Sequence, residues 1–199
     1  MRALDRRLML TTTLATAVGS AITAALPARA QTGTAPADTE WPSYGGNLAY
    51  WRYAPLDQIN ADNFSKLEVA WQFKTGNFGP RPEFRLQCTP LMIKGRLYAT
   101  AGTRRDVVCL DAATGEIIWV YKSIDEGARA NHSPRRLSGR GVGYWSDGNA
   151  ERIIYVTIGY QLVSLDARTG LPDTAFGENG IVDRSEEHTS ELQSRLHLV

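Results

Sequence analysis

Apolar and polar residues alternate in short runs along the middle of the chain, which is the pattern that half-buried β-strands produce. The runs that predict strands are 68–73, 90–93, 96–100, 107–110, 116–121, 152–158, 161–165 and 181–182. Glycine, aspartate and asparagine separate many of these runs, as expected for tight turns. One short helix is predicted at 60–67, where Asn60 offers a cap. Short strands at even spacing predict an all-β sandwich, barrel or propeller.

An internal repeat distinguishes among these three architectures. Segments 91–122 and 143–176 share one order: a strand, a turn, a second strand, a third strand that ends in Leu-Asp-Ala-x-Thr-Gly, and an outer strand. An earlier segment, 67–76, matches only the outer strand, with Trp71 at the place of Trp119. A propeller repeats its units because each blade packs between two similar neighbours, whereas a sandwich has no reason to do so. The repeat therefore predicts a propeller with one blade in each copy.

The repeated motif contains an aspartate that could be catalytic or structural. The residues concerned are Asp111, Thr114 and Gly115 in the first copy and Asp166, Thr169 and Gly170 in the second. We expect the aspartate and threonine to accept backbone N–H bonds within a turn, and the glycine to supply the positive φ that closes it. Trp119 is expected to lie between blades. Active sites seldom repeat with every structural unit, so the duplication favours the structural role over a catalytic Asp111.

Composition excludes some functions. The chain has 199 residues, of which 43% are hydrophobic and 22% charged, so an ordinary globular core is expected. The net charge is +1 and basic residues are scattered among acidic ones, so no basic cluster indicates binding of nucleic acid. Cys88 and Cys109 could pair in an oxidising compartment, but Cys109 lies within an apolar strand, which favours two free thiols. No haem-attachment motif or metal-spaced cluster of cysteine and histidine occurs.

The first 30 residues are predicted to be an export signal. A basic start precedes an apolar run at 8–26, and a small-x-small cleavage site ends at Ala30. A transmembrane anchor is the alternative, although glycine, serine and threonine make the run weakly hydrophobic. Residues 31–40 form a polar linker. No later run reaches spanning length, so the mature chain is expected to be soluble in a bacterial periplasm or outside the cell.

Residues 184–199 differ from the rest of the chain, because they lack glycine, aromatic residues and strand alternation. Eleven consecutive residues, Arg-Ser-Glu-Glu-His-Thr-Ser-Glu-Leu-Gln-Ser, resemble the in-frame translation of a common sequencing-adapter oligonucleotide. The alternative is a genuine amphipathic helix. We interpret the segment as non-native, so His188 and His197 are not proposed as ligands or bases. The chain is then expected to be the N-terminal fragment of a longer protein.

Residues 41–183 resemble the N-terminal part of the quinoprotein alcohol and glucose dehydrogenases, which depend on pyrroloquinoline quinone (PQQ). The resemblance rests on five stretches: 41–46, 52–60 running into 67–71, 89–91, the Asp-Ala-x-Thr-Gly-x-x-x-Trp motif, and 139–145. It implies an eight-bladed β-propeller of the PQQ type, of which this chain holds about two blades and a leader strand.

The resemblance also implies two cofactor-binding residues. Arg140 matches the arginine that contacts carboxylate or carbonyl oxygens of PQQ, a task suited to a planar and permanently charged donor. Gln87 stands where the family has an acidic residue in contact with the cofactor, so a polar contact is kept and a charge is lost. The vicinal cysteine pair that the alcohol dehydrogenases carry before the arginine is missing here. The glucose dehydrogenases lack this pair too, so its absence favours a resemblance to them. Arg135 and Arg136 either face the cofactor or lie in a solvated loop.

The implied activity is oxidation of an alcohol or an aldose by hydride transfer to PQQ, with Ca²⁺ polarising the quinone and a carboxylate as base. Ubiquinone or cytochrome c is the implied electron acceptor. In the family the calcium ligands and the base lie downstream of this segment, so no catalytic or metal-binding residue is assigned here. The fragment alone is expected to be inactive, because two blades leave strand edges and apolar faces uncovered.

Two other functions remain open. One is a non-catalytic propeller scaffold, like the outer-membrane assembly lipoprotein with similar blades, but no lipobox cysteine stands at the cleavage site after Ala30. The other is a periplasmic sugar-binding propeller without chemistry. The substrate, the electron acceptor and the presence of a haem domain stay open.

Overall fold

The computed structural model describes residues 40–80, 83, 85–123, 126–133 and 138–184. The predicted export signal and the predicted adapter-derived tail after residue 184 lie outside these described residues. The same holds for residues 31–39 of the predicted linker and for Arg135 and Arg136.

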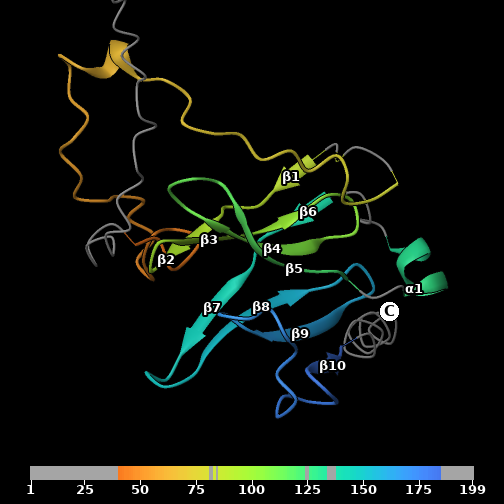
Figure 1. Cartoon of the computed structure of the whole chain (residues 1–199). Coiled ribbons are helices and arrows are strands. Elements are labelled where there is room, and N and C mark those ends of the chain that lie inside the picture. Colours follow the sequence, from red (N-terminus) through yellow and green to blue (C-terminus); the bar gives the residue numbers. More distant parts are fainter. Residues whose placement is uncertain (1–39, 81–82, 84, 124–125, 134–137, 185–199) are drawn as a thin grey trace, which may run out of the picture. The chain divides into compact units, whose positions relative to one another are not determined.

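Two four-stranded antiparallel sheets dominate the described residues (Figure 1). The first contains β2 (Leu91–Ile93), β3 (Arg96–Ala101), β4 (Asp106–Asp111) and β5 (Ile117–Tyr121). The second contains β7 (Gly143–Ser146), β8 (Glu151–Val156), β9 (Gln161–Asp166) and β10 (Ile181–Asp183). In both sheets the strands lie side by side in chain order, joined as antiparallel neighbours. This meander is the form of a propeller blade, so the predicted two blades are confirmed.

The segment before the first blade departs from the prediction. The expected strand at 68–73 is not a strand, and the leader contacts β2 through a single β-bridge between Trp41 and Met92. A strand forms only when a neighbour pairs with its backbone, and none of the described residues pairs with 68–73. The predicted helix is a short 3₁₀ turn, η2 (Phe64–Lys66), and the Asn60 side chain accepts N–H bonds just before it.

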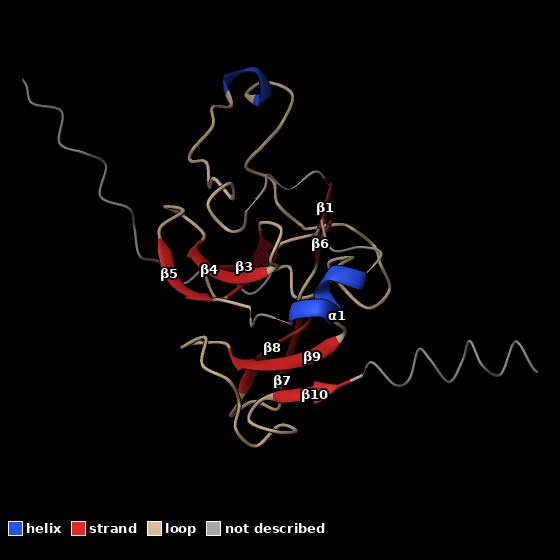
Figure 2. Cartoon of the chain, turned by 90° about the vertical axis from the view of Figure 1, so that its right-hand side faces the viewer, coloured by secondary structure: helices blue, strands red, loops and turns tan. Residues whose placement is uncertain are grey.

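Three elements were not predicted. A parallel pair joins β1 (Arg85–Gln87) to β6 (Ser138–Arg140), and a six-residue helix, α1 (Gly127–His132), lies between the blades in sequence. Figure 2 shows β1 beside β6, with α1 near the ends of β8 and β9. Strands of three residues are too short to show an alternating pattern, so periodicity could not reveal the parallel pair.

Strand β4 is buried on both faces, which explains its unbroken apolar sequence. Val107 and Cys109 belong to the core that the two blades share, together with Trp119 from β5 and Ile153 and Val163 from the second sheet. The opposite face of the strand packs in a second cluster. Its members include Val108 and Leu110, with Trp71, Phe73 and Phe78 of the leader packed against them. One blade is therefore covered on both sides, as propeller packing requires.

Both cysteines are free, as predicted. Cys109 is fully buried within β4, and burial raises the pKa of its thiol to about 11. Cys88 is half-buried, and burial raises its pKa as well. A thiol with a raised pKa is a poor nucleophile at neutral pH, so both residues behave as small core side chains.

The repeated motif forms the predicted turn in both copies. Oδ1 of Asp111 accepts the N–H groups of Ala113 and Thr114 at 2.9 Å, and Oδ1 of Asp166 accepts those of Arg168 and Thr169 at 3.0 and 2.9 Å. The closing glycines, Gly115 and Gly170, have φ values of 74° and 72°. The structural interpretation of the aspartates is thus confirmed.

Each tryptophan of the repeat contacts the turn of the following copy. The Trp119 indole nitrogen donates to the carbonyl oxygen of Ala167 at 3.1 Å, and that of Trp71 donates to Ala112 at 3.2 Å. Trp119 is 9% exposed, which confirms that it lies between blades.

Candidate functional site

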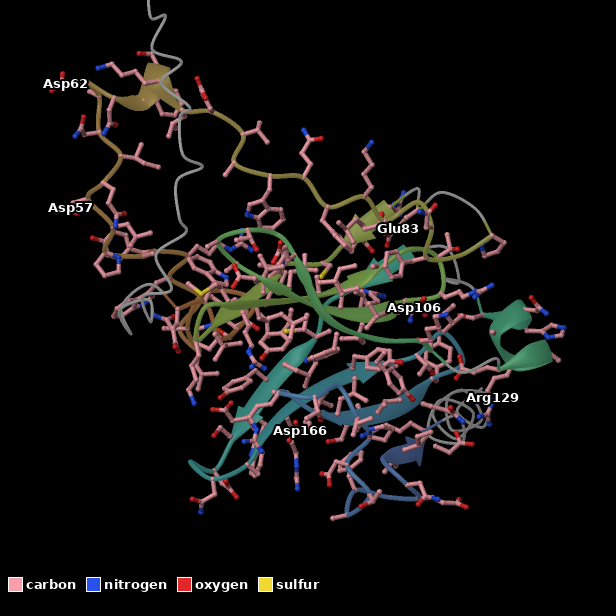
Figure 3. The ribbon with its side chains drawn as sticks, in the orientation of Figure 1. Asp57, Asp62, Glu83, Asp106, Arg129 and Asp166 are labelled. Atoms are coloured by element: carbon pink, nitrogen blue, oxygen red, sulfur yellow. The ribbon has the colours of Figure 1, made fainter. Side chains whose placement is uncertain are left out.

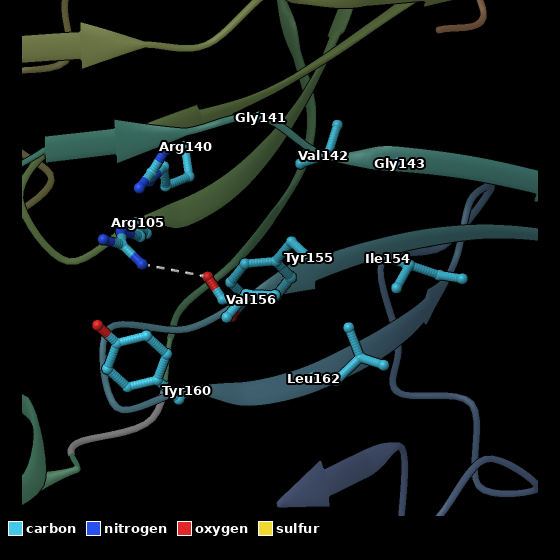
Figure 4. A pocket seen from close by; sticks show the side chains of 10 residues that line it. All are labelled: Arg105, Arg140, Gly141, Val142, Gly143, Ile154, Tyr155, Val156, Tyr160 and Leu162. Atoms are coloured by element: carbon cyan, nitrogen blue, oxygen red, sulfur yellow. Dashed lines mark hydrogen bonds between the residues drawn. The ribbon is translucent and has the colours of Figure 1, made fainter. Parts of the chain in front are cut away.

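A cavity of about 560 Å³ lies where the two blades meet (Figure 4). Its wall is made by the end of β6, the start of β7, the ends of β8 and β9 that meet in a turn, and the β3–β4 turn of the first blade. Cavities of this size are typical of small-molecule sites. The side chains that line it carry two arginines and no carboxylate, so the wall is electropositive.

Arg140 lies at the end of β6 and lines this cavity. Its backbone carbonyl accepts a hydrogen bond from the hydroxyl of Thr100, a buried residue of β3, which ties the arginine to the first blade. Its guanidinium makes no hydrogen bond or ion pair with the described residues. A guanidinium carries five N–H donors, so this group is available to a ligand.

Gln87 lies directly opposite Arg140 in the parallel β1–β6 pair. Facing residues of a parallel pair project to the same side, so the two residues predicted to contact a cofactor are neighbours. They differ in position relative to the cavity, because Gln87 is exposed and does not line it. The structure therefore brings the two together along the backbone and places only Arg140 in the cavity wall.

Arg105 is a second arginine of the cavity that the sequence did not indicate. It ends the turn between β3 and β4 with a φ of 56°, and only 4% of its surface is exposed. Its Nη1 donates across the blade boundary to the carbonyl oxygens of Thr157 at 3.0 Å and Val156 at 3.4 Å. Burial, and then the charge of Arg140, lower the pKa of Arg105. Charged residues in hairpin turns are normally solvated, so nothing in the sequence distinguished this one from Arg104.

A hydrogen-bonded network holds the backbone of Arg105. The Ser123 hydroxyl donates to the Arg105 carbonyl at 2.9 Å and lies 2.8 Å from the Tyr155 hydroxyl. Ser123 also donates its N–H to Asp106, labelled in Figure 3, at 2.9 Å. Asp106 is 3% exposed, and burial raises the pKa of its carboxyl. The turn that carries Arg105 is thus fixed by both blades.

Glu126 holds the β8–β9 turn, which contributes Tyr160 to the cavity wall. Its carboxylate accepts the Thr157 hydroxyl at 2.5 Å and the Gly159 N–H at 2.6 Å, so it holds the β8–β9 turn from 31 and 33 residues away in sequence. Helix α1, which follows Glu126, is joined to β10 by an ion pair of Arg129 and Asp183 at 2.7 Å. The connection between the blades is therefore anchored to the second blade.

The described residues contain no group of three or more histidine, cysteine, aspartate or glutamate side chains that could hold a metal ion. The cavity wall has no nucleophile paired with a base either. What this part of the chain offers is binding: two guanidinium groups and the Tyr160 phenol beside apolar side chains such as Val142 and Leu162. That combination suits a planar anionic ligand.

The family model described as glucose/ethanol/alcohol dehydrogenase, β-propeller domain, of the PQQ type, matches residues 41–197. Among curated proteins, the dehydrogenase subunit of the quinone-dependent alcohol dehydrogenase of Gluconobacter oxydans (strain 621H) is 34% identical over 168 residues. That match covers 79% of this chain and 21% of the relative. The quinoprotein glucose dehydrogenase of the same organism is 35% identical over 162 residues, covering 73% of this chain and 20% of the relative.

Solved structures give the same picture. The quinohemoprotein alcohol dehydrogenase ADHIIG from Pseudomonas putida HK5 has a TM-score of 0.59 and 27% identity, covering 74% of this chain and 20% of that one. The quinohemoprotein alcohol dehydrogenase from Comamonas testosteroni has a TM-score of 0.53 and 29% identity, covering 66% and 18%. A europium-containing methanol dehydrogenase also matches, with a TM-score of 0.54 and 28% identity, covering 67% of this chain and 22% of that one. The chain spans about one fifth of the curated relatives it matches.

Proposed function

The chain belongs to the PQQ-type glucose, ethanol and alcohol dehydrogenase family and carries part of its β-propeller domain, and we propose that it is the N-terminal part of a longer enzyme that oxidises an alcohol or an aldose with PQQ. The complete protein is then the full gene product that contains residues 41–183. The length of the relatives, about five times the matched segment, supports this proposal.

The observation that carries the proposal is the charge of the cavity between the blades. PQQ is a planar tricarboxylate, so a site for it needs cations and hydrogen-bond donors that face its carboxylates. The cavity wall meets this requirement with Arg105 and Arg140. The residues present therefore fit the cofactor, whereas a purely structural propeller has no need for two guanidinium groups at one cavity.

Arg140 is proposed to bind the cofactor directly, because none of the described residues binds its guanidinium and its backbone is fixed between β1 and β3. Gln87 is proposed to bind from the neighbouring position on β1. An amide offers both a donor and an acceptor, so it replaces a carboxylate without facing the anion with a like charge. When bound, PQQ supplies the electrophilic quinone that accepts a hydride from the substrate. The aldose side of the family is favoured because no vicinal cysteine pair precedes Arg140.

A metal ion, Ca²⁺ in this proposal, is assigned to residues outside those described, since the latter form no metal-binding group. The europium in the methanol dehydrogenase named above supports a metal in such an enzyme.

We further propose export to the periplasm through the signal at residues 1–30, and electron transfer to ubiquinone or cytochrome c. Among the described residues, no helix is long and apolar enough to cross a membrane.

The test is PQQ binding and PQQ-dependent dye reduction by the complete protein. We expect it to bind PQQ and to reduce a dye with glucose or a primary alcohol as donor, and Arg140→Met to weaken PQQ binding strongly. Arg168→Met is the control, because Arg168 is exposed and does not line the cavity that contains Arg140. A complete protein that folds but binds no PQQ would contradict the proposal and favour a propeller used as a scaffold or for sugar binding.

A further inference from the structure

Arg105 stands at a backbone position where a bulky residue is unexpected. A φ of 56° lies in the left-handed region, which glycine, asparagine and aspartate adopt with less strain than arginine. From this position the guanidinium extends from the first blade to the carbonyl oxygens of Val156 and Thr157 on the second.

Burial disfavours the charged form of this guanidinium. The hydrogen bonds that its Nη1 donates to the second blade go to the carbonyl groups of Val156 and Thr157. Arg140 approaches the same cavity from β6, and its positive charge acts unfavourably on Arg105. The charges of Glu126 and Glu83 and the Tyr160 phenol act in the opposite direction, more weakly than burial and Arg140.

The two arginines converge although they come from different parts of the chain. Figure 4 shows both guanidinium groups at the same end of the cavity, with the Tyr160 ring nearby. One comes from the β3–β4 turn and the other from the end of β6, so their convergence depends on the packing of the blades. An anion placed between them would offset both the repulsion and the desolvation.

We propose that Arg105 is a second anion-binding residue of this cavity, and that it contacts a carboxylate of the tricarboxylate cofactor together with Arg140. This inference rests on the proposed function and assigns a further residue to the same site. Because Arg105 also bridges the two blades, the bound anion would strengthen the blade–blade contact.

The shape of the guanidinium matters as well as its charge. Arginine presents a planar fork, so one nitrogen can bind the carbonyl groups of Val156 and Thr157 while another donates to a carboxylate of the ligand. Lysine has a single ammonium at its end and would have to divide its donors between the carbonyls and the anion. Arg105→Lys should therefore bind better than Arg105→Met and less well than the natural protein.

The experiment measures dissociation constants of PQQ and of its trimethyl ester, which lacks the carboxylate charges, by calorimetry on the complete protein without substrate. The variants are Arg105→Met, Arg105→Lys and Arg104→Met. Arg104 is the matched control, because it is a cation in the same turn that is exposed and does not line the cavity. Melting temperatures with and without PQQ give a second measurement that does not depend on turnover.

We expect Arg105→Met to weaken PQQ binding about tenfold or more, as loss of a charge-assisted contact predicts. Binding of the ester should change less than threefold, and the rise in melting temperature on adding PQQ should shrink. Arg104→Met should bind both compounds as the natural protein does.

Equal weakening of PQQ and ester binding in Arg105→Met would overturn the inference, since it would indicate a structural role alone. Unchanged PQQ binding would overturn it too. If Arg105→Met does not fold, Arg105→Lys decides by the same comparison of the two compounds. Loss of PQQ binding in Arg140→Met with normal binding in the Arg105 variants leaves the proposed function intact. A natural complete protein that binds no PQQ overturns both.

Discussion

The ring of Trp119 lies so close to Gly170 that a Cβ atom at this glycine would be 2.6 Å from the ring. The two residues belong to consecutive copies of the repeat, and the indole nitrogen also donates to the Ala167 carbonyl in the same turn. Trp71 and Gly115 show the same contact one copy earlier, where a Cβ atom on the glycine would again be 2.6 Å from the ring. The motif therefore encodes a joint between neighbouring blades.

Gly170→Ala is expected to destabilise the complete protein. The change places a side chain at a φ of 72° and against the Trp119 ring, so about 2–4 kcal/mol should be lost from the free energy of unfolding. Gly95→Ala is the matched control, because Gly95 also has a φ of 72° but no atom within 4 Å of a Cβ. Denaturant unfolding measures the difference between the two variants. Equal losses in the free energy of unfolding would show that the contact with Trp119 does not affect stability.

Trp119→Phe tests the hydrogen bond of the same joint. Phenylalanine fills only part of the space and removes the indole donor from the Ala167 carbonyl, which keeps the hydrogen bond from the Tyr98 hydroxyl. The lost hydrogen bond and the lost packing together predict a loss of about 1–3 kcal/mol. Trp145→Phe is the comparison, since Trp145 is 41% exposed and its ring takes part in a cation–π interaction with Arg152. Its loss should stay below about 1 kcal/mol. Thermal unfolding of both variants checks the prediction, which fails if they lose the same stability.

Asp166 is expected to make stability depend on acid pH. Burial raises the pKa of its carboxyl, but hydrogen bonds from Thr169 and Arg168 outweigh burial and the net pKa is lowered. A carboxyl with a lowered folded-state pKa contributes stability above its unfolded pKa of about 3.9 and loses it as the pH falls through the folded value. Asp166→Asn should therefore be less stable than the natural protein at neutral pH, with the gap closing below about pH 4.

The control for Asp166→Asn is Asp62→Asn, because Asp62 is exposed beside η2. Urea unfolding between pH 2 and 7 is the measurement. A gap between Asp166→Asn and the natural protein that stays constant over this range would contradict the assignment.

Glu126→Gln should loosen the connection between the blades. The amide keeps one acceptor oxygen but brings an NH₂ group toward the donors of Thr157 and Gly159, which leaves a donor facing a donor. We expect the Gly159 amide to exchange with deuterium about tenfold faster, because local opening is easier by roughly 1–2 kcal/mol. Glu116→Gln, an exposed change in the first blade, should leave this rate unchanged. Unaltered exchange at Gly159 would show that Glu126 does not hold the turn.

The 199-residue chain alone is expected to lack a cooperative thermal transition and PQQ-dependent dye reduction. Its leader exposes large apolar side chains, among them Trp51 at 72% and Phe64 at 68%, which further blades would cover. Calorimetry and a dye-reduction assay of the purified chain, with the complete protein as control, measure both quantities under one set of conditions. A sharp melt together with dye reduction would contradict this expectation.

Local patterns predicted most of the strands. The apolar residues that mark β3, β4, β8 and β9 each lie within about six residues of sequence, and the predicted strand bounds agree with the structure to within about two residues. The segment at 68–73 has the same alternation and is not a strand, because alternation fixes which side chains are apolar but does not supply a neighbouring backbone.

The candidate site was predicted only in part. Arg140 was found through the resemblance of the segment around it, and the structure places it in the cavity wall. Gln87 was found in the same way and lies beside Arg140 but outside the wall. Arg105 and Glu126 were missed, since each looks like a charged residue in a solvated loop and acquires its role from partners more than 30 residues away.

The sequence by itself determined the blades and their joints. Strand alternation, the Asp and Thr that bind the turn backbone, the glycine with positive φ and the tryptophan are all readable within one repeat, because hydrogen bonds inside a turn join residues two or three positions apart. Only the tertiary structure decided the cavity. It brings Arg105 of the first blade close to Arg140, which precedes the second blade in the sequence. The electrostatic energy of two cations depends on the distance between them in space, and the spacing of the two residues along the chain does not encode that distance.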